Sequence, residues 1–96
     1  MNSKQRAFLK SIAMSTEPIM QIGKERLTPE ITAAVSEALE ARELVKISVL
    51  NNCQESPDDL GRVLAERTKS EVVQVIGKKI VLYRESKTKK KIELPK

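Results

Sequence analysis

Residues 19–50 decide the fold, and they read IMQIGKERLTPEITAAVSEALEARELVKISVL. The apolar run at residues 19–22 predicts a short buried strand, and the glycine that follows it predicts a loop. Thr28 and Pro29 together are typical of a helix start, because a threonine hydroxyl caps the first turn and proline suits the first helical position. An apolar stripe at helical spacing then predicts a helix that runs to about Arg42.

A second strand follows this helix at residues 44–50. Val45, Ile47 and Val49 alternate with Lys46 and Ser48, which indicates a strand with one face in the core. A strand, a helix and another strand in this order require a crossover. We therefore expect a parallel pair of strands with a right-handed connection.

The flanking segments add two helices and a hairpin. We expect a helix over residues 3–14 with Ser3 as its cap, and another that begins at Ser56. Residues 72–76 and 79–83 are rich in β-formers, and Gly77 at the first of two loop positions predicts a type II′ turn between them.

The predicted order is therefore α-β-α-β-α-β-β, in a single α/β domain with a four-stranded mixed sheet and helices packed on it. The order of the strands within the sheet stays open. We assign residues 1–86 to the domain and residues 87–96 to a basic C-terminal tail that is extended or frayed. On this view the tail lies outside the core, and its removal leaves the melting temperature nearly unchanged.

Charge and composition narrow the functional classes. The chain has 96 residues, a net charge of +5, one cysteine and no histidine. The commonest general base and metal ligand is thus missing, so we expect no enzyme, metal ion, cofactor or small-molecule substrate. No apolar run approaches the length of a membrane span or a signal peptide, which predicts a cytoplasmic protein without membrane contact. Residues 78–96 hold eight Lys or Arg and two Glu, and such a basic end is typical of nucleic-acid binders.

The junction of the first strand with the second helix is the best candidate for a binding site. Gly23 allows the backbone to approach a ligand closely, and Lys24 and Arg26 add two cations. The helix that Thr28 caps directs its positive end toward the same place, which suits a phosphate. The alternative is an ordinary strand-to-helix turn with charged tips.

Other basic residues could extend this site. They lie on the first helix, at the hairpin tip and after the last strand: Lys4, Arg6, Lys10, Lys78, Lys79 and Arg84. For those at the hairpin and after it, the alternative is that they only keep an edge strand soluble. The aromatic residues, Phe8 and Tyr83, are too few for base stacking on a sheet, and we expect both in the core.

Five segments carry a resemblance to a known family: KQRAFLK at residues 4–10, QIGK at 21–24, LTP at 27–29, EALEARELVK at 37–46 and VVQVIGKKIVLYR at 72–84. Together they resemble the CRM domain (chloroplast RNA splicing and ribosome maturation), whose bacterial single-domain form is YhbY-like. The resemblance implies a fold similar to the C-terminal domain of translation initiation factor 3. It also implies binding to structured RNA, a precursor of the large ribosomal subunit, through a Gly-x-x-Gly loop and the basic residues around it. The chain departs from that loop, because Arg26 stands where the family has the second glycine.

The sequence thus predicts a monomeric, non-catalytic RNA-binding protein that acts in assembly of the large ribosomal subunit. The alternative is a non-catalytic adaptor that binds ribosomal or nucleotide-handling proteins. Salt-insensitive binding through an apolar patch would mark the adaptor.

Overall fold

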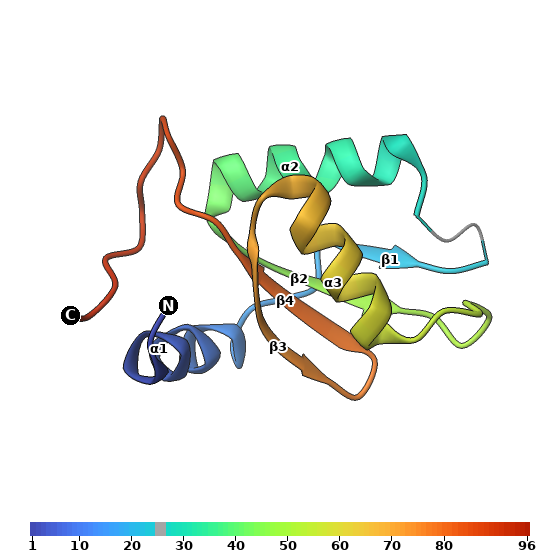
Figure 1. Ribbon diagram of the computed structural model, residues 1–96, viewed down its shortest axis with the longest axis horizontal. Coiled ribbons are helices and arrows are strands. Elements are labelled where there is room, and N and C mark those ends of the chain that lie inside the picture. Colours follow the sequence, from blue (N-terminus) through green and yellow to red (C-terminus); the bar gives the residue numbers. More distant parts are fainter. Residues whose placement is uncertain (25–26) are drawn as a thin grey trace.

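The computed structural model describes residues 1–24 and 27–96, and it shows a sheet with helices on both faces (Figure 1). In chain order its elements are α1 (Ser3–Ala13), β1 (Met20–Ile22), α2 (Pro29–Arg42), β2 (Leu44–Val49), α3 (Pro57–Thr68), β3 (Glu71–Ile76) and β4 (Lys79–Tyr83). The predicted order of elements and the mixed α/β sheet are confirmed. Among the described residues, no helix has both the length and the apolar character needed to cross a membrane.

The strand order, which the sequence left open, is β1-β2-β4-β3. β1 and β2 form the expected parallel pair, with Met20 opposite Ile47. β4 lies between β2 and β3 and runs antiparallel to both. The last strand of the chain is therefore central, and β3 is an edge strand with a register irregularity between Val72 and Gln74.

The β3–β4 turn has the geometry that the sequence predicts. Gly77 has a φ of +56°, whereas Lys78 is not among the residues with positive φ. A type II′ turn needs positive φ only at its first central residue, while a type I′ turn needs it at both.

Two apolar clusters hold the layers together. The α2 and α3 side of the sheet buries Val45, Ile47 and Val49 from β2, as the alternation predicts. The opposite face packs against α1 through residues such as Leu9 and Val81. Lys46 points to this second face, where its Nζ donates to the Ala13 carbonyl at 2.9 Å and so satisfies the C-terminal end of α1.

Helix α1 differs from the prediction in two respects. Its cap is Asn2 and not Ser3, because the Asn2 side chain accepts the Gln5 N–H at 2.8 Å while the Gln5 side chain accepts the Asn2 N–H. Phe8 is 38% exposed, so its expected place in the core is wrong. The helix turns Leu9 and Ala13 toward the sheet, and Phe8 falls at the border of that stripe. Tyr83, in contrast, is buried as expected.

The C-terminal residues also differ from the prediction. They form no helix or strand, but Ile92 and Leu94 pack against the α1 cluster. The Gln5 Nε2 donates to the Pro95 carbonyl at 3.0 Å, which joins the end of the chain to its beginning. The expectation of a frayed tail outside the core is therefore wrong. We refer to residues 86–94 as the strap.

Candidate nucleic-acid interface

Three segments that lie far apart in the sequence meet at one end of the sheet. The Leu50 N–H donates to the Ile22 carbonyl at 2.8 Å, which joins the ends of β1 and β2. The Val49 N–H donates to the Lys78 carbonyl at 2.7 Å, which joins the end of β2 to the hairpin turn. We call this region, formed by residues 23–24, 27–28, 50–52 and 77–79, the loop end.

Close packing explains the glycine of the loop end. Gly23 has no positive φ, but a Cβ atom there would lie 3.0 Å from the Asn52 Oδ1 and 3.1 Å from the Leu50 Cδ1. The loop after β2 thus lies close to Gly23, and a larger residue there would require the Asn52 or Leu50 side chain to move. A surface depression of about 430 Å³ lies beside it, with Gln21, Lys24 and Ile31 also in its lining.

The start of α2 offers few free donors to an anion. Pro29 has no N–H, and the Ile31 N–H donates to the Thr28 hydroxyl at 3.1 Å. The Thr32 N–H donates to the Thr28 carbonyl. In the first turn only the Glu30 N–H has no bond to a described residue, and the Glu30 carboxylate opposes an anion. Thr28 therefore acts mainly as a helix cap.

The charge of the loop end comes instead from side chains. Lys24 and Lys78 are exposed, and Lys79 is half-buried on a strand where it pairs with Ser48. Arg26, the fourth predicted cation of this region, lies outside the described residues. Gly23 and Lys24, which follow β1, therefore lie at the same end of the sheet as Lys78 and Lys79 of the hairpin.

Two arginines of the predicted site, Arg6 and Arg84, form hydrogen bonds within the fold. The Arg6 Nη1 donates to the Val72 carbonyl at 2.6 Å and the Val73 carbonyl at 3.1 Å, where the edge strand β3 is irregular. Arg6 therefore supplies partners for carbonyls that the irregular ladder leaves open. Lys4 and Lys10 remain exposed on α1, which lies at the opposite end of the molecule from the loop after β1 (Figure 1).

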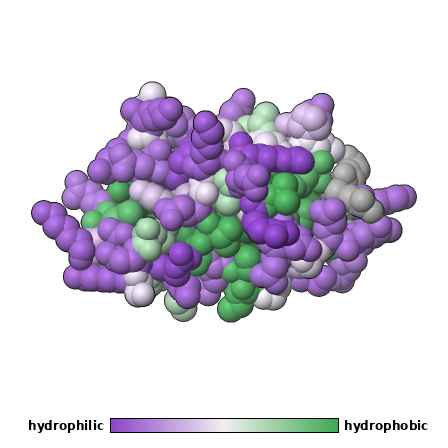
Figure 2. Space-filling view, viewed as in Figure 1, coloured by the Kyte–Doolittle hydropathy of each residue, from purple (hydrophilic) through white to green (hydrophobic). Residues whose placement is uncertain are grey.

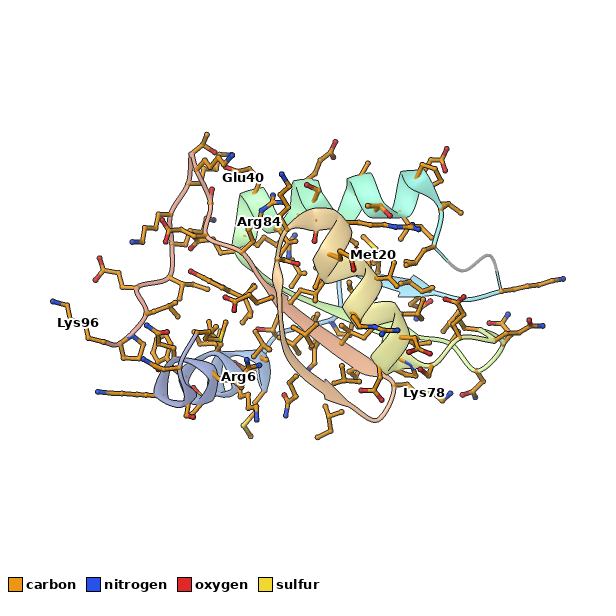
Figure 3. The ribbon with its side chains drawn as sticks, viewed as in Figure 1. Arg6, Met20, Glu40, Lys78, Arg84 and Lys96 are labelled. Carbon is orange, nitrogen blue, oxygen red and sulfur yellow. The ribbon has the colours of Figure 1, made fainter. Side chains whose placement is uncertain are left out.

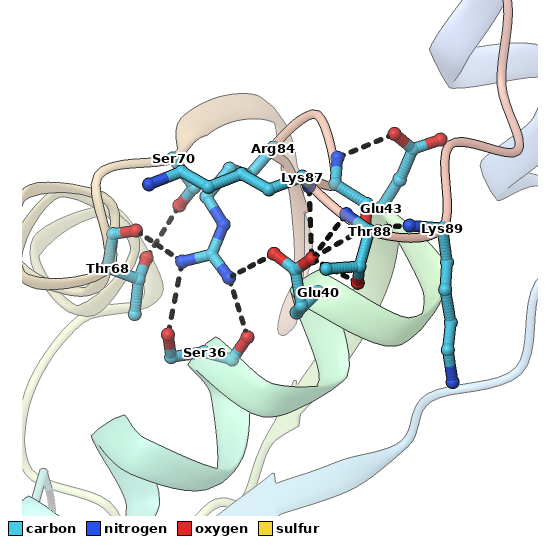
Figure 4. A network of polar contacts seen from close by, with 10 residues as sticks. Ser36, Glu40, Glu43, Thr68, Ser70, Arg84, Lys87, Thr88 and Lys89 are labelled. Atoms are coloured by element: carbon cyan, nitrogen blue, oxygen red, sulfur yellow. Dashed lines mark hydrogen bonds and ion pairs between the residues drawn. The ribbon is translucent and has the colours of Figure 1, made fainter.

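Arg84 joins three elements. Its guanidinium donates to the Ser36 hydroxyl and carbonyl on α2 and to the Thr68 carbonyl at the end of α3, all within 3.1 Å (Figure 4). It also pairs with Glu40 at 3.7 Å. Arg84 and Glu40 lie on the side of the molecule away from Lys78 (Figure 3). Arg84 thus stabilises the fold and is not part of the loop end.

The sequence did not reveal the role of two carboxylates at the end of α2. Glu43 is fully buried, and its Oε1 accepts the Lys91 and Ile92 N–H groups, each at 2.7 Å. Its Oε2 accepts the Ser86 N–H at 2.7 Å. Glu40 accepts the N–H groups of Lys87 and Thr88 at 3.0 Å and both nearby hydroxyls. The two carboxylates therefore hold the strap by its backbone.

These bonds lower the pKa of both acids. The Thr88 and Ser86 hydroxyls, helped by two backbone N–H groups, lower the pKa of Glu40 to about 2. Burial pushes the pKa of Glu43 upward, but its three N–H donors and the nearby Lys90 outweigh burial and hold that pKa below its ordinary value. A signal was present, since acids in the last turn of a helix oppose the helix dipole and need other partners.

The protein is thus a small α/β domain with exposed lysines on the loops at one end of its sheet. Among the described residues, no group of three or more His, Cys, Asp or Glu could hold a metal ion. A family model of the CRS1 / YhbY (CRM) domain matches residues 1–84. The chain belongs to this family.

Three known proteins match this chain over nearly the full length of both sequences. The chain is 47% identical to the "Probable RNA-binding protein YqeI" of Bacillus subtilis over 95 residues, which cover 99% of each protein. It is 34% identical to an "RNA-binding protein" of Haemophilus influenzae, over 100% of this chain and 96% of that one. The solution structure of the protein SAV1595 from Staphylococcus aureus superposes with a TM-score of 0.82 at 45% identity, over 99% of each chain.

Proposed function

We propose that this protein binds structured RNA through the loop end, and that it does so without catalysis. The observation that carries this proposal is that Lys24 and Lys78 lie at the same end of the sheet, where backbone bonds join Ile22 to Leu50 and Val49 to Lys78. The names of the relatives as RNA-binding proteins support it. Because exposed lysines supply the charge and few helix donors are free, phosphate contacts by side chains dominate the binding.

We further propose that the RNA is a precursor of the large ribosomal subunit and that the protein acts on it as a monomer in the cytoplasm. Membership in the CRM family supports this role. Sucrose-gradient sedimentation of cell extract tests it, because an assembly factor travels with pre-ribosomal particles. A protein found only in the soluble fractions at low salt would contradict the assembly role but not RNA binding itself.

RNA binding itself is tested by filter binding to a structured ribosomal RNA fragment. With several phosphate contacts, the affinity should fall steeply, by about a hundredfold or more, between roughly 50 and 200 mM salt. A flat response to salt would contradict the proposal and favour an adaptor that binds proteins.

A further inference from the structure

The strap carries a dense group of cations at the other end of the molecule. Lys87, Lys89, Lys90 and Lys91 fall within five consecutive residues and are all exposed. The domain measures 39 Å along its longest axis, and Lys96 and Lys78 lie toward opposite ends of it (Figure 3). Apolar residues reach the surface mainly in the middle of the face that Figure 2 shows, with hydrophilic residues toward both ends.

The hydrogen bonds of the strap leave these lysine side chains unused. Glu40 and Glu43 accept backbone N–H groups and the hydroxyls of Ser86 and Thr88. The Lys89 N–H donates to the Ser86 hydroxyl at 2.8 Å, and its side chain points away from that network (Figure 4). None of the four ammonium groups forms an ion pair with a described residue. Glu40 and Glu43, which we call the clamp, thus fix the backbone of the strap and leave its cations exposed to solvent.

Such an arrangement fits a polyanion. Four like charges on neighbouring residues repel one another, and an ordered backbone keeps them close. A string of phosphates matches several closely spaced cations at once, and binding releases the counterions of those phosphates. A flexible tail would lose more conformational freedom on binding, whereas the clamped strap has already lost it on folding.

We propose that the strap, held by Glu40 and Glu43, is a second RNA-binding surface that contacts a segment of the same RNA distant from the one at the loop end. This inference rests on the proposed RNA-binding function. It assigns the two carboxylates a role that their charge alone would not suggest, because two acids here strengthen the binding of an anion.

The sign of that effect provides the test. The variant with Glu40→Gln and Glu43→Gln is more positive by two charges, so simple electrostatics predicts tighter RNA binding. A Gln side chain offers one acceptor oxygen where Glu offers two, and its amide N–H₂ would face a backbone donor of the strap. We expect this variant to bind the structured ribosomal RNA fragment more weakly, with a salt slope lower by one unit or more, about the contribution of one or two lost phosphate contacts.

The matched control is the variant with Glu17→Gln and Glu66→Gln. It removes two exposed acids elsewhere on the protein, and it should bind the RNA as tightly as the parent or tighter.

A second variant keeps the clamp intact. Replacing the four strap lysines with Gln leaves their backbone N–H groups in place and removes only the attraction of Lys90 to Glu43, so the melting temperature should change little while the salt slope falls by about two to four units. If this variant binds like the parent, or if the Glu40 and Glu43 variant is folded and binds as tightly as its control, the inference is overturned. Should the variant with Glu40→Gln and Glu43→Gln fail to fold, the lysine variant alone decides.

The strap inference and the proposed function can fail separately. If only loop-end variants lose binding, the strap inference is overturned and the proposed function stands. If the parent protein binds no RNA, both are overturned.

Discussion

Glu43 and Ile92 stand 49 residues apart in the sequence and are joined by a 2.7 Å hydrogen bond from the Ile92 N–H to the Glu43 carboxylate. Glu43 ends helix α2 with a φ of +69°, a conformation that is rare outside glycine. The buried carboxylate and the strap therefore depend on each other. Without the strap, the Glu43 carboxylate would lose the three backbone N–H groups that hold it.

Truncation after Glu85 should accordingly destabilise the domain. The truncated chain loses the contacts of Ile92 and Leu94 with the α1 cluster and leaves Glu43 without its three donors. We expect a loss of about 3 kcal/mol or more in the free energy of unfolding, since each hydrogen bond to a charged group contributes about 1.5–3 kcal/mol and the burial of Ile92 and Leu94 adds to it. Thermal denaturation followed by circular dichroism should show a melting temperature lower by about 10 °C or more. Truncation after Pro95 is the control, because it removes only the exposed Lys96 and should change little. An unchanged melting temperature after the longer truncation would show that the strap is not part of the folded structure.

Acidification should weaken the hold of Glu40 and Glu43 on the strap and so lower the stability of the protein. Both carboxylates have a folded-state pKa below their ordinary value of 4.5, so their contribution to stability is present above that pH. It is lost as the pH falls from about 4.5 toward the pKa of Glu40, about 2. The free energy of unfolding should therefore fall more steeply in this window for the parent than for the Glu40→Gln and Glu43→Gln variant. Urea denaturation at several pH values measures both slopes, and parallel curves would speak against the clamp.

Arg84→Gln should destabilise the fold more than most changes of a surface charge. The change removes charged hydrogen bonds to Ser36 and to the Thr68 carbonyl, which should cost about 2 kcal/mol. Arg62→Gln is the matched control, because the Arg62–Asp59 pair at 3.0 Å is exposed and contributes little. Urea denaturation of both variants gives the comparison. Equal stabilities would mean that Arg84 is free to serve a ligand, as the sequence suggested.

Gly23→Ala tests the close packing at the loop end. The added Cβ would approach Leu50 and the end of the Asn52 side chain, and overpacking of this kind costs about 1–3 kcal/mol. We expect the lower end of that range, because Asn52 is exposed and its side chain can move. Gly77→Ala, at a φ of +56° with open space around it, provides a contrast in which backbone strain alone acts. A Gly23→Ala protein as stable as the parent would mean that the loop after β2 adjusts without cost.

The sequence predicts local features of this fold well. Strand periodicity at Val45, Ile47 and Val49 identified the buried face, and the caps at Thr28 and Ser56 each accept the N–H three residues later. Gly23 and Lys24 were also placed correctly in the loop after the first strand, and Lys78 in the hairpin turn. These are features of neighbouring residues, which periodicity and capping rules describe.

Features set by tertiary packing could not be predicted in this way. A hairpin can dock by either strand, so the central place of β4 was undetermined. Arg6 and Arg84 have long side chains, and only the fold brings the Val72 and Thr68 carbonyls within their reach. The strap looked like a solvated tail because its lysines dominate its composition, while its bonds are made by backbone N–H groups that every residue except proline carries.

The most direct test of RNA binding at the loop end is a comparison of two double variants with equal charge. Lys24→Gln with Lys78→Gln removes two exposed cations from the loop end, and Arg42→Gln with Arg67→Gln removes two exposed cations from the ends of α2 and α3. Filter binding to a structured ribosomal RNA fragment over several salt concentrations gives the affinity and the salt slope of each. We predict that the loop-end pair binds more weakly than the parent, with a slope lower by about two units, while the control pair keeps the slope of the parent. If the two pairs lose affinity equally, or if the loop-end pair loses none, the loop end is not where this protein binds RNA.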